Sequence, residues 1–135
     1  MLLHQASRLS VFVILVFAAT ASASEQLTNQ PIVSGQFQAT IYTRSSPVII
    51  NRIFQWEIVL QDLQGKPIEN ANIIIRGGMP EHNHGLPTAP KVTKYLGAGK
   101  YLIEGVKFHM AGNWQLEFIV STNDQQEVLT FAYQL

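Results

Sequence analysis

Hydrophobic and polar residues alternate along three long stretches of the chain. Apolar side chains fall at every second position within residues 37–41, 53–60 and 114–121. Because successive side chains of a strand point to opposite faces, this period of two predicts strands with one face against a core. No comparable run with helical spacing occurs after the first 23 residues. The pattern therefore predicts an all-β domain.

Turn-forming residues divide the chain into further strands. Glycine, asparagine, aspartate and proline gather in four short segments, at residues 62–67, 97–99, 111–113 and 121–124. The first predicts a hairpin-type turn, and further strands are predicted at residues 68–76, 100–108 and 127–134. About seven strands at this short, regular spacing are typical of an antiparallel β-sandwich.

Three aromatic residues of these strands have an expected structural role. Trp56 and Trp114 stand in alternating strands, so we expect both to pack between the sheets. We expect Tyr101 to be a core or corner tyrosine whose hydroxyl finds a backbone partner.

The first 23 residues resemble a secretory signal peptide. Arg8 and the amino terminus supply positive charge, an apolar run follows at residues 9–19, and small residues come next. The Ala-x-Ala rule places cleavage after Ala23, with Ala21 as the alternative. The apolar run is shorter than the about 20 residues of a spanning helix, so we expect no membrane span in the mature form.

This leader predicts the domain organisation and the compartment. After the signal peptide at residues 1–23, we expect a flexible N-terminal segment at 24–34 and one sandwich domain at 35–135. We expect the mature protein to reside in the bacterial periplasm or an equivalent space outside the cytoplasm.

Composition narrows the chemistry that such a domain can carry. The chain has nine basic and nine acidic residues, and loss of Arg8 leaves the mature form with one excess negative charge. This balance predicts no nucleic-acid partner. There is no Cys, so thiolate metal sites and thiol catalysis are excluded. The sequence also lacks Gly-x-Ser-x-Gly, His-Glu-x-x-His and a Gly-rich phosphate loop, and we expect no enzymatic activity.

One connection, residues 77–90, differs from the short turns. It reads Gly-Gly-Met-Pro-Glu-His-Asn-His-Gly-Leu-Pro-Thr-Ala-Pro and holds two of the chain's four histidines. Three prolines restrict its backbone, so we expect an ordered loop. Loops on a rigid scaffold commonly carry function.

Motifs in and after this loop resemble the YtkA-like family of exported domains. They are Met-Pro-x-His-x-His-Gly at residues 79–85, Gly-x-Tyr at 99–101 and a Phe-x-Met-x-Gly-x-Trp-x-Leu run at 108–116. The resemblance covers most of the mature chain, from about the second predicted strand to Val120. It implies a seven-stranded immunoglobulin-like sandwich. It also implies an association with copper handling or cytochrome oxidase assembly.

Five side chains are candidate metal ligands: Met79, His82, His84, His109 and Met110. Imidazole and thioether donors without thiolates or clustered carboxylates favour copper, with zinc next. In an extended loop the two histidines at 82 and 84 would project to the same side, and Pro80 would hold Met79 extended. The second pair follows a predicted strand, whose end could lie at the same end of the sandwich as the loop. In a regular strand only one of the two side chains could join the site, unless the chain bends, as Gly112 would allow.

Each of these residues also has a structural interpretation. His82 and His84 can be solvated loop residues, and Met110 can pack in the core beside Trp114. The main hypothesis is a periplasmic copper-binding domain that delivers copper or assists oxidase assembly. The alternative is a non-metal interaction module that docks a periplasmic or membrane protein through the 77–90 loop or a sheet edge.

Overall fold

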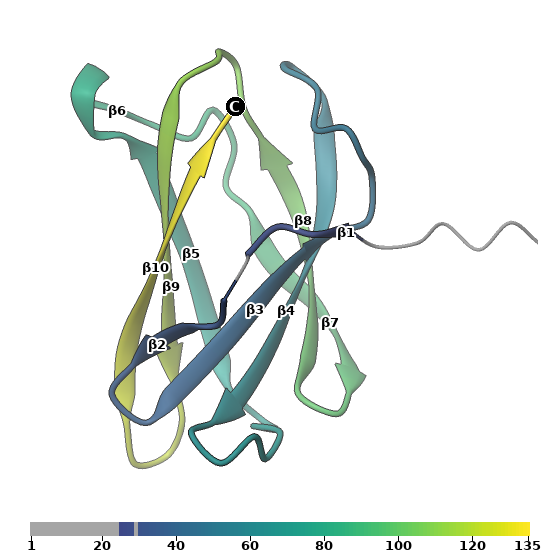
Figure 1. Ribbon diagram of the computed structural model, residues 1–135, viewed down its shortest axis with the longest axis vertical. Coiled ribbons are helices and arrows are strands. Elements are labelled where there is room, and N and C mark those ends of the chain that lie inside the picture. The colour runs from purple at the N-terminus through teal and green to yellow at the C-terminus, as the bar shows by residue number, and fades with distance from the viewer. Residues whose placement is uncertain (1–24, 29) are drawn as a thin grey trace, which may run out of the picture.

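The computed structural model describes residues 25–28 and 30–135, which form an all-β antiparallel sandwich (Figure 1). The predicted signal peptide and its cleavage sites lie outside the described residues. Among the described residues, no helix is long and apolar enough to cross a bilayer.

The described residues contain ten strands, of which seven are long and three are short. The long strands match the predicted number, whereas segments of two or three residues are too short to show a period of two. The long strands are β3 (Phe37–Thr43), β4 (Ile53–Asp62), β5 (Asn72–Met79), β7 (Lys91–Gly97), β8 (Lys100–Lys107), β9 (Asn113–Ser121) and β10 (Gln126–Gln134). The short elements are β1 (Glu25–Gln26), β2 (Ile32–Ser34), β6 (His84–Gly85) and the 3-10 helix η1 (Pro80–His82).

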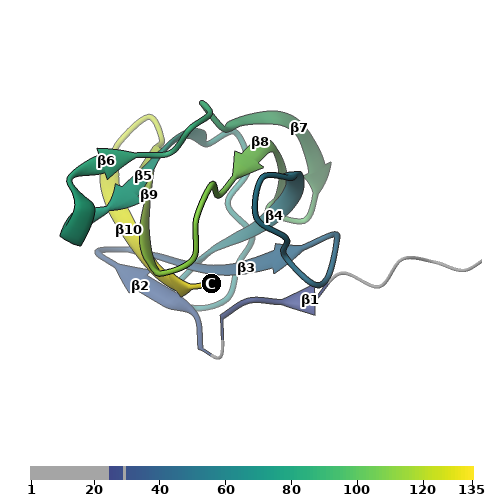
Figure 2. The same ribbon diagram turned by 90° about the horizontal axis from the view of Figure 1, so that it is seen from above.

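The strands follow the order β1-β3-β4-β8-β7-β5-β9-β10, with antiparallel pairing throughout. Between β7 and β5 only Ile74 and Lys91 pair. The sheet turns a corner there, so that β5, β9 and β10 lie across the core from β3, β4 and β8 (Figures 1 and 2).

The predicted alternation is confirmed along the three stretches that showed it most clearly. In β4, for example, Phe54, Trp56, Ile58 and Leu60 are all buried. Trp56 and Trp114 both lie in the core, and Phe108 packs between them, with ring centroids 5.7 and 5.1 Å away. These aromatic contacts extend the core to the end of the sandwich where β8 ends.

The turn at residues 62–67 forms as predicted and closes a short hairpin, in which Gln61 pairs with Pro67 and the Ile68 amide donates to Leu60 O at 3.0 Å. The Lys66 amide donates to Asp62 Oδ1 at 2.8 Å. The next strand, β5, begins at Asn72 and pairs with β9 in the opposite layer. The buried Tyr101 hydroxyl donates to Ile68 O at 2.8 Å and accepts from the Ala71 amide at 3.1 Å. This confirms a corner tyrosine and fixes the chain where it crosses between layers.

The described residues of the segment at 24–34, for which the sequence predicts flexibility, pair with β3. Glu25 pairs with Thr43, and Ile32 pairs with Ala39. Thr28 is buried, and its Oγ1 accepts the Ile41 amide at 3.3 Å. Because β1 and β2 are only two and three residues long, they are too short to show a period of two in the sequence.

Candidate functional site

The start of the 77–90 segment is a tight hairpin rather than a loop. Strand β5 continues to Met79, helix η1 turns the chain, and β6 pairs back so that His84 lies opposite Met79. A Cβ on Gly78 would overlap the backbone of His84, so glycine is needed where the two strands approach this closely. The expected long loop is thus shorter and more regular than the sequence suggested.

The two histidines of this hairpin come together by a different route from the expected one. Met79 is extended, as predicted for a residue before proline, with φ −109° and ψ 101°. The prediction of an extended chain through His82 and Asn83 is wrong, because His82 lies in η1 and Asn83 is left-handed with φ 51°. The turn nevertheless leaves the His82 and His84 ring centroids 5.8 Å apart, with ring planes at 19°.

His109 reaches the same end of the sandwich, as the sequence predicted. Strand β8 ends at Lys107, and the chain bends through residues 109–112, where Gly112 has φ +133°. The His109 ring centroid lies 4.8 Å from that of His84, and the ring planes are inclined at 49°. Nδ1 of His109 is buried and has no hydrogen-bond partner. Nε1 of Trp56 has the same status in the core, but an indole N–H can only donate, whereas an imidazole nitrogen can also accept a metal ion.

Trp114 lies against both histidines and positions them. Its ring centroid is 5.4 Å from that of His109 and 5.8 Å from that of His84. Its indole Nε1 donates to Met110 O at 3.1 Å, which holds the bend that carries His109. The sequence interpretation placed Trp114 in the core but missed this contact, because the alternation of a strand does not show what packs against its end.

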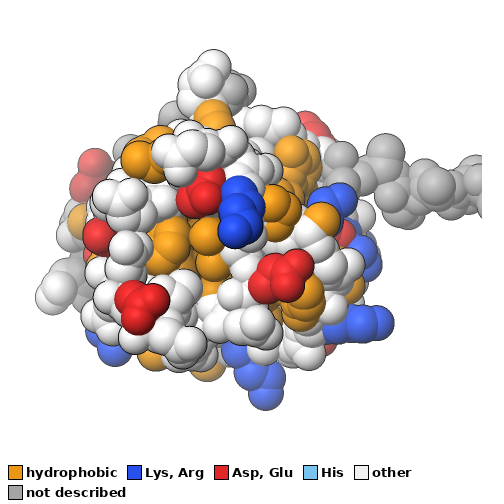
Figure 3. All heavy atoms as spheres, turned by 90° about the horizontal axis from the view of Figure 1, so that it is seen from below, with side chains coloured by type: hydrophobic (Ala, Val, Ile, Leu, Met, Phe, Trp, Pro, Cys, Tyr) orange, Lys and Arg blue, Asp and Glu red, His pale blue; other side chains and the backbone are white. Residues whose placement is uncertain are grey.

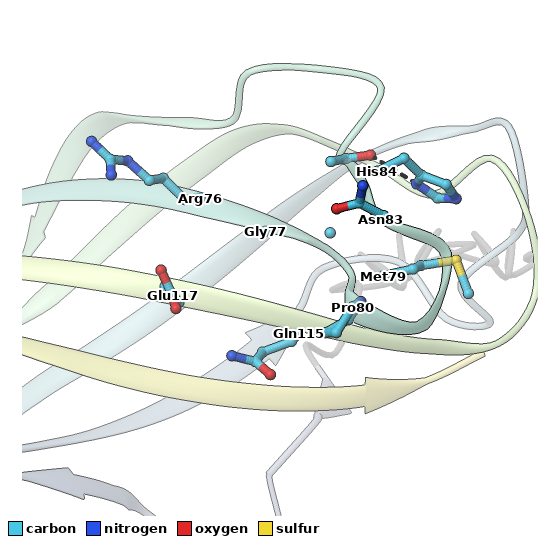
Figure 4. A pocket seen from close by; sticks show the side chains of 10 residues that line it. Arg76, Gly77, Met79, Pro80, Asn83, His84, Gln115 and Glu117 are labelled. Atoms are coloured by element: carbon cyan, nitrogen blue, oxygen red, sulfur yellow. Dashed lines mark hydrogen bonds between the residues drawn. The ribbon is translucent and has the colours of Figure 1, made fainter.

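The two methionines are less available than the imidazoles. Met79 is 1% exposed, and its methyl group lies where a Cβ of Gly112 would be. Met110 is half-buried and packs against the core, as its structural interpretation expected. In Figure 4 the side chains of Met79 and His84 extend toward the same end of the molecule, away from Arg76 and Glu117.

The ring separations can be compared with those of a shared metal ion. An ion about 2.0–2.1 Å from an imidazole nitrogen lies about 3.2 Å from that ring's centroid. Two imidazoles at a tetrahedral angle around the ion then have centroids about 5.2 Å apart. The 4.8 Å between His84 and His109 is close to this value. The His82 and His84 rings are stacked, and nitrogen lone pairs in nearly parallel ring planes do not converge on one ion in this arrangement.

The three imidazoles do not form a finished metal site. Within residues 25–28 and 30–135, no group of three or more His, Asp or Glu side chains is arranged to hold a metal ion. The closest pair is His84 with His109, and Nδ1 of His84 lies 3.3 Å from Gly85 O.

The sequence model of the YtkA-like family matches residues 33–118, which is more than half of the chain. The chain belongs to the YtkA-like family. The matched residues include all five candidate ligands of this YtkA-like domain, and they begin earlier than the sequence resemblance suggested. Comparison with curated proteins and with solved structures found no match.

Proposed function

We propose that this YtkA-like domain binds one copper ion outside the cytoplasm and passes it to a partner by ligand exchange. The observation that carries the proposal is the buried, unpartnered Nδ1 of His109, whose ring lies 4.8 Å from that of His84. In the Nε2–H tautomer, Nδ1 presents a lone pair, which is the form of imidazole that binds metals.

The exposure of the three histidines suggests an order of events. His82 is exposed on η1, whereas His84 and His109 are half-buried beside Trp114. An ion captured at His82 could move to His84 and then to the closer pair, since neighbouring rings are 5.8 and 4.8 Å apart. The reverse sequence would return the ion to the surface, where a partner's ligands could replace His82.

Copper is favoured by the donor types present. With no Cys in the chain, the soft donors near this site are the thioethers of Met79 and Met110. Imidazole with thioether suits copper better than magnesium or calcium, and copper exceeds zinc in general affinity for such donors. The predicted signal peptide supports a location in the periplasm. Because the chain has no Cys, no thiolate of its own would compete with the imidazoles for copper.

The test is copper uptake by residues 24–135, measured for Cu(I) against a chromogenic chelator and for Cu(II) by quenching of tryptophan emission. We expect one ion per wild-type chain and loss of tight uptake in His84→Ala and in His109→Ala. His82→Ala should keep the stoichiometry and slow the uptake. Glu81→Gln, an exposed neighbour, is the matched control. Equal uptake by all four variants and the wild type would contradict the proposal.

A groove favours the alternative function, a protein-interaction module. This open hollow of about 400 Å³ lies beside His84 on the outer side of β5 and β9 (Figure 4). Its lining includes Arg76, Asn83, Gln115 and Glu117, which offer hydrogen bonds of both kinds. Pull-down of a partner by wild type but not by Arg76→Ala/Glu117→Ala, with no copper uptake in any variant, would support this alternative instead.

A further inference from the structure

The connection between β3 and β4 ends in a turn with apolar side chains at its tip. The Arg52 amide donates to Ile49 O at 3.2 Å, and Asn51 adopts a left-handed conformation with φ +64°. Ile49, Ile50 and Ile53 are 46%, 39% and 68% exposed. We call residues 47–53 the isoleucine turn.

This composition is unusual for an exposed turn. Tight turns are normally built from Gly, Pro, Asn, Asp and Ser, because these residues suit the backbone and are well hydrated. Val48 packs against the core and anchors the isoleucine turn, but the three isoleucines have no such cover. A cluster of exposed aliphatic side chains on one protrusion indicates a surface that contacts something apolar.

The isoleucine turn lies at the end of the sandwich that carries the histidines. The Asn51 amide donates to Phe108 O at 2.7 Å, and Phe108 immediately precedes His109. Ile53 pairs with Lys107 at the end of β8. Both the turn and β6 lie at the upper end of the molecule in Figure 1, and the view from above in Figure 2 shows them on opposite sides of the chain end marked C.

The charged residues nearest the isoleucine turn are Arg52 within it and Lys107 opposite Ile53, and the next carboxylate along β8 is Glu104, which accepts a hydrogen bond from Gln55 Nε2. Arg52 is exposed and Lys107 is half-buried, and no carboxylate among the described residues lies within 4.0 Å of either side chain's nitrogens. The one ion pair among the described residues joins Arg44 and Glu57. At the opposite end of the sandwich, carboxylates as well as basic groups surround the apolar area (Figure 3). The balanced charge of the whole chain conceals this local difference.

We propose that the isoleucine turn docks on an anionic phospholipid surface. The three isoleucines would enter the boundary between headgroups and acyl chains, and Arg52 and Lys107 would contact lipid phosphates. Such contact is peripheral and needs no spanning segment. It would hold the end with His84 and His109 close to the membrane, within reach of a membrane-bound partner. The proposal does not depend on copper binding.

The test is co-sedimentation of residues 24–135 with vesicles. This segment contains the entire core, which runs from Phe37 to Phe131. We expect binding to vesicles that contain phosphatidylglycerol, weaker binding to pure phosphatidylcholine vesicles, and a decrease in binding with added salt. Ile49→Ser/Ile50→Ser/Ile53→Ser should lower the partition coefficient about tenfold or more. Arg52→Gln/Lys107→Gln should remove the preference for anionic lipid.

The matched control is Val33→Ser/Leu63→Ser/Val128→Ser, which removes three similarly exposed side chains outside this turn. It should bind like the wild type. A second measurement uses Ile50→Trp, whose emission should shift to shorter wavelength on anionic vesicles. Equal binding to both lipid compositions, equal binding by the triple isoleucine variant, or no vesicle binding would overturn the proposal. The last result would leave a protein partner as the occupant of the turn.

Discussion

We expect His109 to lower the stability of the metal-free domain while providing a copper ligand, and His109→Phe tests both effects. The phenyl ring keeps the edge-to-face contact with Trp114, whose centroid is 5.4 Å away at 81°. It removes the buried Nδ1, which has no hydrogen-bond partner in the described structure. We therefore expect the substitution to stabilise the metal-free domain and to abolish its tight copper binding.

The magnitude follows from the cost of an unmet polar group. Leaving a buried donor or acceptor unsatisfied costs about 1–3 kcal/mol. Part of this gain is lost because phenyl is larger than imidazole and the core is closely packed. A net gain of about 1 kcal/mol corresponds to a rise of about 3–5 °C in Tm for a domain of this length. Copper at about one hundred times its Kd should stabilise the wild type by about 2.7 kcal/mol and leave the variant unchanged.

The assay is thermal unfolding of wild type and His109→Phe with and without copper, followed by near-ultraviolet circular dichroism. The variant should unfold at the higher temperature without metal, and the order should reverse when copper is added. A metal-free variant that is less stable than the wild type would contradict the expected net gain from removing the unpaired Nδ1. Equal stabilisation of both proteins by copper would show that His109 is not a ligand.

Two further substitutions test the corner between the layers and the bend that carries His109. Tyr101→Phe removes the hydroxyl that bridges Ile68 O and the Ala71 amide, and should lower the free energy of unfolding by about 1–2 kcal/mol in denaturant titration. Burial raises the pKa of Tyr101 above its ordinary 10.0, so this stabilisation should be full below pH 10 and lost as the pH rises through the folded-state pKa; an unchanged alkaline unfolding profile in Tyr101→Phe would contradict this. Gly112→Ala should cost about 1–3 kcal/mol, because it strains φ and crowds the methyl of Met79. Gly65→Ala is the control for backbone strain alone, because Gly65 has φ +83° and open space around it. Equal losses of unfolding free energy in the two variants would show that crowding of Met79 contributes nothing.

The sequence predicted the fold well because burial in a sandwich repeats every second residue. The buried residues of β3, β4 and β9 are the ones that the alternation selects. The same signal is absent from β1, β2 and β6, which are two or three residues long and held by backbone pairing. It also cannot show that the chain changes layers after the 62–67 turn, because that step depends on the Tyr101 hydroxyl.

The sequence predicted which residues belong to the candidate site better than it predicted their arrangement. Residue types and a bend at Gly112 were enough to place His109 at the same end as His84. The helical turn at His82 and the left-handed Asn83 were not predicted, since a Pro-x-His-Asn run is compatible with extended and turned backbones alike. Trp114 contacts His109, a near neighbour in sequence, and also His84, which is distant in sequence, and no local pattern records the second contact.

The segment at residues 108–112 links the parts of this end of the molecule. The Phe108 carbonyl accepts the Asn51 amide of the isoleucine turn, and the Met110 carbonyl accepts the Trp114 indole. Gly112 exchanges two backbone hydrogen bonds with Leu135, at 2.8 and 3.1 Å. His109 sits between these fixed points, so its imidazole is held by the same contacts that hold the turn and the aromatic core. A ligand bound at His109 would therefore restrain the residues to which this segment is hydrogen-bonded. Contact at the isoleucine turn would in the same way restrain the Phe108 backbone next to the site.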